Sequence, residues 1–326
     1  RQRDTRQFAA HPDELGRRIA RKNYEVEFSP KSAIAERVNW PHSPSESRGI
    51  EDARFVRFVE DDGSVIYQAT YTAFDGEQVS PKMLETSDFR RSRMLQLAGP
   101  AAQNKGMALF PRKVGGRYVA LSRWDREDLA IATSYDGRRW EDPRMLHVPS
   151  RPWELIKTGN CGSPIETPHG WLVLLHGVGP MRQYSIGAML LDLDDPTIVL
   201  ARLAEPLVQP LGAQREGYVP NVVYSCGAVE HRGIIWLPYG IGDQRISLRF
   251  ASRVGGPSNS NPRLQPPRGS VMTPIVPHLT ATSRPASPPF LTHRTPHGPF
   301  ARLAILAPVP ARCFPSATPQ APLSPR

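Results

Sequence analysis

Apolar and polar residues alternate in short segments through most of residues 24–252, and this period of two predicts β-strands. Four of these segments look alike, because each follows a turn rich in Gly or Asp and has an aromatic residue near its start. They span residues 67–74, 118–124, 171–178 and 235–241, so that their starts are 51, 53 and 64 residues apart. Strands therefore recur along the chain as a repeated package.

A strand-rich unit that repeats about every 50 residues is typical of β-propeller blades, each of which has four antiparallel strands. We expect an all-β fold with four recognisable blades in this chain. The alternative is an all-β sandwich, whose strands also alternate with turns but do not repeat as a package.

The chain divides into three parts. Residues 1–23 form an N-terminal segment in which only Pro12 to Lys22 has a helical pattern, and residues 24–252 form the strand-rich domain. Residues 253–326 contain 17 of the 35 prolines and eight arginines, but no Asp, Glu or Lys. Proline at this density opposes helix and sheet, so we expect this tail to be disordered or to follow a slip of the reading frame near residue 252.

The charge distribution argues against a nucleic-acid partner. The whole chain has a formal net charge of +10, but residues 1–252 contain 33 basic and 31 acidic residues, so the excess lies in the tail. A basic patch within the folded part is what nucleic-acid binding would require. We therefore expect no nucleic-acid partner.

The sequence gives no sign of a disulfide framework, a metal site or a membrane span. Cys161, Cys226 and Cys313 are far apart and lie in no Cys/His spacing typical of a zinc site. The longest apolar stretches are well short of the roughly 20 residues that a membrane helix needs. The chain begins at Arg1 without a signal-peptide pattern, so we expect a missing N-terminal portion and a cytoplasmic protein.

The first candidate for chemistry is the segment that contains Glu51 and Asp52, which Arg48 and Arg54 flank just before an apolar strand. Two adjacent carboxylates in a channel of low dielectric cannot both ionise easily, so one of them can act as a general acid. The alternative for this segment alone is a solvated turn with local ion pairs.

Further polar residues interrupt the strand pattern in later repeats. They lie in the segments 104–113, 157–167, 216–221 and 239–243, together with Arg123 and His176 at strand ends. A propeller collects loops from all of its blades at one end of a central channel. We therefore expect these segments to meet at one site.

These segments together resemble glycoside hydrolase family 130, the β-mannoside phosphorylases and β-1,2-mannosidases. The similarity covers roughly residues 24–250. Four motifs in the same order carry it: Gly-x-Glu-Asp-x-Arg at 49–54, Asn-Lys…Ala-Leu-Phe-Pro-Arg-Lys at 104–113, Pro-Ile-x-Thr…Gly-Trp-Leu…His-Gly at 164–177 and Tyr-Gly…Asp at 239–243. The resemblance implies a five-bladed β-propeller, which we expect to be incomplete in this chain.

The resemblance also implies roles for individual residues. Asp52 matches the family's general acid, which protonates the glycosidic oxygen through the 3-hydroxyl of the mannosyl group. The residues that look like the phosphate-binding set are Arg112, Arg123, Lys157 and His176. Guanidinium groups suit bidentate phosphate contacts, and Lys adds a point charge.

The resemblance implies sugar contacts as well. Hydroxyl groups of the sugar would bind Arg54, Asn104, Lys105 and Asp243, and Tyr218 or Tyr239 would provide a stacking surface. No metal and no cofactor is implied, and inorganic phosphate would be a co-substrate.

The number of carboxylates needed depends on the reaction. Inverting hydrolysis needs an acid and a separate base, whereas phosphorolysis supplies its own anionic nucleophile. Glu166 and Glu216 are the candidates for a base, although Glu166 can equally pair with Lys157 or Arg112. For His176, the alternative is a strand-end histidine that is hydrogen-bonded to the backbone.

The sequence therefore favours an enzyme that cleaves a β-mannosidic bond with phosphate and releases mannose 1-phosphate. Its partners would be a β-mannoside oligosaccharide and phosphate. We expect no membrane partner, and a homo-oligomer is possible. The alternatives are an inverting β-1,2-mannosidase and a non-catalytic or truncated glycan-binding propeller.

Overall fold

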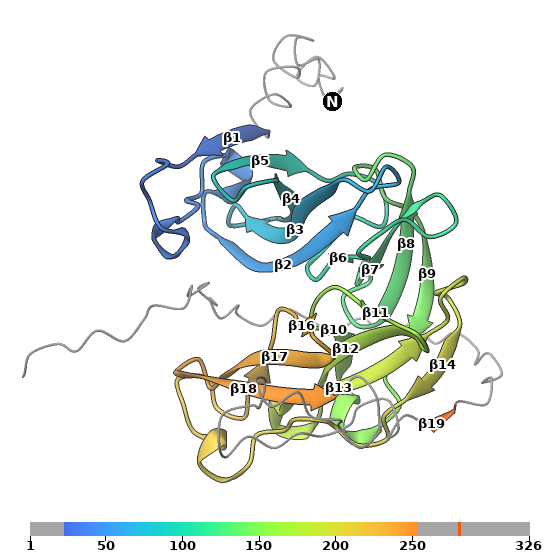
Figure 1. Cartoon of the computed structure of the whole chain (residues 1–326). Helices are drawn as coiled ribbons and strands as arrows, with labels where there is room; N and C mark the ends of the chain where they lie inside the picture. The colour runs from blue at the N-terminus through green and yellow to red at the C-terminus, as the bar shows by residue number, and fades with distance from the viewer. Residues whose placement is uncertain (1–22, 253–279, 282–326) are drawn as a thin grey trace, which may run out of the picture.

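The computed structural model describes residues 23–252 and 280–281, and in these ranges the protein is all-β, as predicted (Figure 1). The helical turns in the described ranges are short 3-10 turns: η2 (Ile34–Glu36), η3 (Pro44–Glu46), η4 (Pro152–Glu154), η5 (Pro180–Arg182) and η6 (Gly212–Arg215). None of these turns is long and apolar enough to cross a membrane. The helix expected near Pro12–Lys22 and nearly all of the proline-rich tail lie outside the described residues.

The first sheet contains five strands in the order β1-β5-β4-β3-β2. Their bounds are β1 (Tyr24–Glu27), β2 (Ile50–Val59), β3 (Val65–Phe74), β4 (Val79–Thr86) and β5 (Arg91–Gln96). The four strands β2 to β5 form an antiparallel meander, and β1 adds to its outer edge through pairs such as Tyr24 with Met94.

Three more sheets follow in chain order. The second contains β6 (Ala108–Leu109), β7 (Tyr118–Ser122), β8 (Leu129–Ser134) and β9 (Glu141–His147). The third contains β10 (Lys157–Asn160), β11 (Ile165–Thr167), β12 (Gly170–Val178), β13 (Tyr184–Leu191), β14 (Val199–Arg202) and β19 (Thr280–Ala281). The fourth contains β15 (Val223–Tyr224), β16 (Val229–His231), β17 (Ile234–Ile241) and β18 (Arg245–Ser252).

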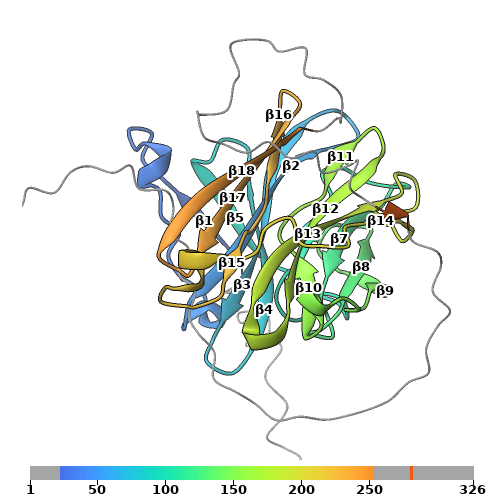
Figure 2. The same ribbon diagram turned by 90° about the horizontal axis from the view of Figure 1, so that it is seen from below.

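The repeat seen in the sequence corresponds to the repeat of sheets. The four similar segments form β3, β7, β12 and β17, and each of these strands pairs antiparallel with an earlier strand of its sheet: β2, β6, β10 or β15. The four sheets succeed one another in a propeller-like ring (Figure 1), and β15 of the fourth sheet contacts β13 of the third (Figure 2). The prediction of four repeated units is confirmed, and the sandwich alternative does not apply.

Apolar side chains between neighbouring sheets form the core. Phe58 of β2 packs in one cluster with Leu109 of β6, and Leu121 of β7 packs in another with Val173 of β12. The opposite face of β12 contributes Leu172 and Leu174 to a third cluster with residues of β17. Each central sheet thus buries both of its faces, which explains the long apolar run in β12.

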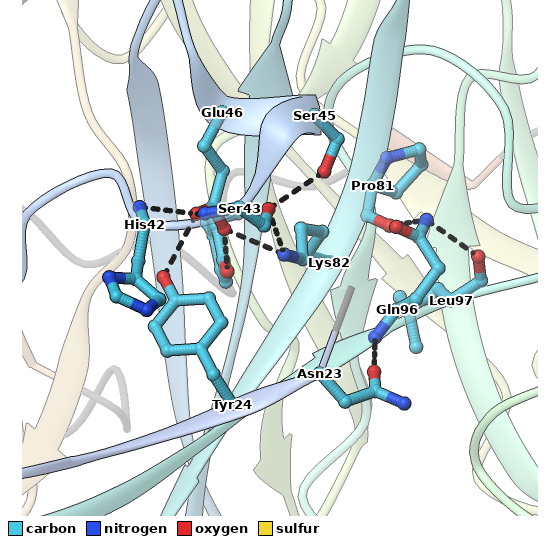
Figure 3. A network of polar contacts seen from close by, with 11 residues as sticks. Asn23, Tyr24, His42, Ser43, Ser45, Glu46, Pro81, Lys82, Gln96 and Leu97 are labelled. Carbon is cyan, nitrogen blue, oxygen red and sulfur yellow. Dashed lines mark hydrogen bonds and ion pairs between the residues drawn. The ribbon is translucent and has the colours of Figure 1, made fainter. Parts of the chain in front are cut away.

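The segment before β2 is attached to the first sheet by a buried ion pair (Figure 3). Lys82 Nζ donates to Glu46 Oε1 at 2.7 Å, and the hydroxyls of Tyr24 and Tyr71 donate to the same carboxylate at 3.0 and 2.8 Å. Both charged side chains are fully buried. Burial opposes the charge, but hydrogen bonds from Lys82 and from two backbone N–H groups lower the pKa of Glu46 to about 2.

The fourth sheet has one exposed face. Ile246 and Leu248 of β18 are 66% and 50% exposed, and Val229 of β16 is 60% exposed. On the opposite face, Leu237 and Ile241 are buried against the third sheet. The fourth sheet therefore presents an apolar surface beside the ring.

Candidate active site

Strands β2, β6, β10 and β15 begin at the same end of the ring, and several sequence-predicted residues meet there. Arg54 of β2 contacts Tyr224 of β15, which is 170 residues later in the chain. Arg123, which directly follows β7, contacts His176 of β12. Side chains from all four sheets therefore surround one site, as the propeller prediction requires.

Asp52 lies on an irregularity of β2. The register with β3 shifts between Glu51 and Arg54, where three residue steps on β2 oppose two on β3, so that β2 contains a bulge. Asp52 itself has a φ of 58°, a conformation that is unfavourable for a residue with a side chain. The bulge turns the carboxylate toward the fourth sheet, where Asp52 Oδ2 lies 3.4 Å from Tyr224 Oη.

Arg54 links the Asp52 carboxylate to the fourth sheet. Its Nη2 donates to Tyr224 Oη at 2.7 Å and lies 3.7 Å from Asp52 Oδ2. The side chain is only 2% exposed, and its Nε has no hydrogen-bond partner among the described residues. A buried cation with an unused donor of this kind can accept an anionic or hydroxyl ligand.

Arg123 and His176 form the second half of the site. Arg123 Nη1 donates to His176 Nε2 at 3.0 Å, and because arginine only donates, this ring nitrogen must be the acceptor. Burial, together with the positive charges of Arg123, Arg54 and Lys157, lowers the pKa of His176 well below its ordinary value. His176 is therefore neutral and acts as a hydrogen-bond acceptor, not as a cation.

Gly159 makes the contact between Arg123 and His176 possible. A Cβ atom at this position would lie 2.7 Å from Arg123 Cδ and 2.8 Å from His176 Cε1. Gly159 is the cross-strand partner of His176, so the arginine passes over the one position of β10 that has no side chain.

Two tyrosines that the sequence reasoning missed complete the site. Tyr184 stacks on His176 with 6.3 Å between ring centroids, and the Tyr224 ring lies 5.2 Å from the same imidazole. Lys157 Nζ is 5.6 Å from the centroid of Tyr184, a cation–π distance. Tyr224 contacts both Asp52 and His176, so the carboxylate and the basic residues lie one aromatic side chain apart. Tyr184 begins β13 and Tyr224 ends β15, and no local sequence pattern shows that they meet at His176.

The structure does not bring Arg112 to this site. Arg112 forms a bidentate ion pair with Glu166, with Nε–Oε2 and Nη2–Oε1 distances of 3.0 and 2.7 Å. Glu166 pairs with Trp171 at the opposite end of β12 from His176, five residues or about 17 Å along the strand. The geometry therefore agrees with the alternative in which Glu166 simply pairs with Arg112.

Asn104 and Lys105 lie at the same end of the ring as the site, but their side chains bond to other residues. Asn104 Nδ2 donates to the backbone oxygen of Trp124 at 3.1 Å, next to Arg123. Lys105 Nζ forms an ion pair with Glu51, the neighbour of Asp52. Both residues thus border the site.

The candidates near the fourth sheet divide into two groups. The loop that contains Glu216 and Tyr218 packs at Gly217 against the turn that leads to Asp243, and Tyr218 is 77% exposed. Burial raises the pKa of Asp243. Tyr239 differs, because it is 6% exposed and packs in the apolar core between the third and fourth sheets. The structure therefore corrects the expectation that Tyr239 provides a stacking surface.

Within the described ranges, no group of three or more His, Cys, Asp or Glu side chains is arranged to hold a metal ion. Cys161 and Cys226 are free thiols. Cys313 lies outside the described residues.

Comparison with known proteins identifies the kind of propeller. A family profile described as beta-1,4-mannooligosaccharide phosphorylase, that of glycoside hydrolase family 130, matches residues 23–254. The chain belongs to this family of β-mannoside phosphorylases, which confirms the resemblance seen in the motifs.

Curated relatives carry related names. The chain is 40% identical over 212 residues to a 1,2-beta-oligomannan phosphorylase of Thermoanaerobacter sp. strain X514, an alignment that covers 62% of this chain and 68% of the relative. It is 33% identical over 217 residues to a beta-1,2-mannobiose phosphorylase of Listeria innocua, with 64% of this chain and 59% of the relative aligned.

A solved structure supports the fold assignment. The structure of a beta-1,2-mannobiose phosphorylase from Listeria innocua in complex with beta-1,2-mannobiose superposes with a TM-score of 0.57 at 33% identity. The match covers 64% of this chain and 59% of that structure. The chain thus spans between about three fifths and two thirds of the length of these relatives.

Proposed function

We propose that this chain cleaves a β-mannosidic bond by inverting phosphorolysis and releases mannose 1-phosphate. One observation carries the proposal: Tyr224 joins the Asp52 carboxylate to the basic cluster, by which we mean Arg54, Arg123, Lys157 and the neutral His176. A carboxylic acid opposite an anion site is the arrangement that phosphorolysis needs.

The basic cluster suits inorganic phosphate. Arg54 is a buried guanidinium group and Arg123 a partly buried one, and the Nε atom of each has no hydrogen-bond partner among the described residues. Such donors bind phosphate oxygens strongly in a site of low dielectric. Neutral His176 accepts from Arg123 and so orients the guanidinium without adding a charge of its own.

The proposed reaction combines proton transfer from Asp52 with attack by phosphate. Asp52 gives its proton to the leaving glycosidic oxygen, through the 3-hydroxyl of the mannosyl group in the way the family resemblance implies. An oxygen of phosphate forms a new bond to the anomeric carbon from the opposite face as the glycosidic bond breaks. The products are α-mannose 1-phosphate and a shortened sugar, and Asp52 is left ionised until it takes up a proton from water.

The competing reaction is hydrolysis by an inverting β-1,2-mannosidase. It needs a second carboxylate about 6.5–9.5 Å from the acid to activate water. Glu166 is held by Arg112 at the other end of β12, which disfavours it as this base. Glu216 borders the site end and is the remaining candidate of the two.

We propose a β-1,2-linked mannoside as the substrate. The two relatives described above are named for β-1,2 linkages, whereas the family profile is named for β-1,4 linkages. β-1,4-Mannobiose is therefore the comparison substrate.

We also propose that the complete fold is a five-bladed propeller, of which the described residues form four blades. The exposed apolar side chains Ile246, Leu248 and Val229 support this proposal, because a fifth sheet packed on the fourth would bury them.

The test is an incubation of the purified chain with β-1,2-mannobiose, with and without phosphate, followed by ³¹P NMR and sugar chromatography. We expect mannose 1-phosphate only when phosphate is present, and no turnover from Asp52→Asn. Free mannose formed at the same rate without phosphate would establish the hydrolase instead. A sugar that binds equally well to the native chain and to Asp52→Asn, with no turnover in either, would indicate a glycan-binding module.

A further inference from the structure

The Cys226 thiol lies against the carboxylate of Asp52. Cys226 Sγ is 3.9 Å from Asp52 Oδ1, while Tyr224 Oη lies 3.4 Å from the other oxygen, Oδ2. Two donors from one short stretch of the fourth sheet thus face both oxygens of a carboxylate on the first sheet. A thiol is a weak donor, but an ionised acceptor strengthens its hydrogen bond.

The stretch that presents Cys226 is held rigidly. Ser225 Oγ lies 2.8 Å from the backbone oxygen of Gly227 and 2.7 Å from that of Pro238. Gly227 in turn packs against the loop between β10 and β11 of the third sheet, since a Cβ at Gly162 would lie 2.5 Å from Gly227 Cα. The position of the thiol is therefore fixed by two sheets.

Asp52 itself is less constrained by its own strand. It lies in the β2 bulge with a φ of 58°, where the ladder of β2 and β3 is interrupted. A side chain at such a place needs partners from outside the strand to fix its direction.

We propose that Cys226 is a positioning residue for Asp52, whose thiol holds Oδ1 so that the carboxyl group faces the mannoside. The role of Asp52 in this statement rests on the proposed function. Burial, and then the negative charge of Asp52, raises the pKa of Cys226 to about 12, so the group stays a thiol and a donor at neutral pH.

The contact can be tested without turnover, by alkylating the chain with iodoacetamide at pH 8.5 and following each cysteine peptide by mass spectrometry. Removing the neighbouring negative charge in Asp52→Asn makes the thiolate easier to form, so we expect Cys226 to react at least about threefold faster. Glu141→Gln, which removes an exposed carboxylate of β9, is the matched control and should leave the rate unchanged. Cys161 is fully buried and should stay unreacted in all variants, which reports that they are folded. Equal rates at Cys226 in the native chain and Asp52→Asn would overturn the proposal.

The positioning role is tested by kinetics of Cys226→Ala and Cys226→Ser. We expect Cys226→Ala to lower kcat about tenfold while KM for mannoside and for phosphate changes less than about twofold, because substrate contacts remain. Cys226→Ser restores a donor and should keep more than about half of the native kcat. A native kcat in Cys226→Ala, or an equal loss in both variants, contradicts the role. If the native chain turns over no mannoside, the proposed function fails, while the alkylation rates still decide whether the contact exists.

Discussion

Arg123 Nη1 and His176 Nε2 lie 3.0 Å apart, although the two residues belong to different sheets. The contact joins the second and third sheets at the site end and requires the imidazole to be neutral. The Nε atom of Arg123 has no hydrogen-bond partner among the described residues.

Arg123→Leu should raise KM for phosphate by about 10- to 100-fold, because a hydrogen bond to a charged group contributes about 1.5–3 kcal/mol. Arg112→Leu removes a guanidinium that the sequence also suggested for phosphate, but its partner is Glu166 at the other end of β12. We expect its KM for phosphate to stay within about twofold of the native value. Initial rates over a series of phosphate concentrations measure both. Equal effects of the two variants would show that the anion binds elsewhere.

Gly159→Ala should weaken phosphate binding by about tenfold or more. The new methyl group would lie 2.7 Å from Arg123 Cδ, so the arginine must move away from His176. Gly240→Ala is the matched control, since the nearest atom to a Cβ there is Tyr224 O at 3.8 Å. Phosphate titrations of both variants decide the matter, and a native KM in Gly159→Ala would contradict the geometry.

His176 should make the fold less stable in mild acid. Its pKa in the folded state is far below the ordinary value of 6.5 because of burial and its cationic neighbours, so only the unfolded chain takes up a proton as the pH falls below about 6.5. The unfolded state then binds more protons, and this group alone lowers the free energy of unfolding by up to about 1.4 kcal/mol per pH unit.

Urea unfolding between pH 8 and pH 5 measures this dependence. His176→Gln should flatten the decline, whereas His231→Gln, which changes an exposed histidine, should not. The same slope in the native chain and in His176→Gln would show that His176 does not carry the effect.

Lys82→Met should destabilise the fold by about 3–5 kcal/mol, because it leaves the carboxylate of Glu46 buried without its cation. Lys31→Met, on the exposed segment before β2, should change stability by less than about 0.5 kcal/mol. The double variant Glu46→Leu/Lys82→Met should be less damaging than Lys82→Met alone. Urea unfolding at pH 7 compares the three, and a small loss in Lys82→Met would contradict the buried pair.

Much of the fold could be predicted from local sequence. The four similar segments became β3, β7, β12 and β17 because an apolar run bounded by Gly-rich or Asp-rich turns specifies a strand wherever it lies. The motif with Asp52 lies at the start of β2, so it could be assigned to one end of the ring once the strand was predicted.

Arg112 shows where sequence proximity misleads. Asn104 and Arg112 belong to one motif, but β6 (Ala108–Leu109) lies between them and carries the chain from the site end toward the opposite end. A residue that precedes a strand in the chain and a residue that follows it lie at opposite ends of that strand, so the two cannot share a site at one end. The contact of Arg112 with Glu166 depends on the packing of the second sheet on the third, which no local pattern contains.

Tyr239 could have been assigned correctly from the alternation in β17. It has the same parity as Ile235, Leu237 and Ile241, and all four side chains are buried between the third and fourth sheets. Tyr184 and Tyr224 could not have been assigned to the site from local sequence, because their role depends on their contacts with His176, which join strands of the third and fourth sheets.

The site contains residues from all four sheets, so a single cut in the backbone can separate its residues onto two fragments. A backbone cut at the exposed turn around Gly115 and Gly116 would leave Asp52 and Arg54 on one piece, and Arg123, His176 and Tyr224 on the other. If the chain has the proposed phosphorylase activity, neither piece would turn over a mannoside alone, so phosphate consumption by the mixture would count reassembled molecules. The ring could thus serve as a split reporter whose signal depends on fragment complementation.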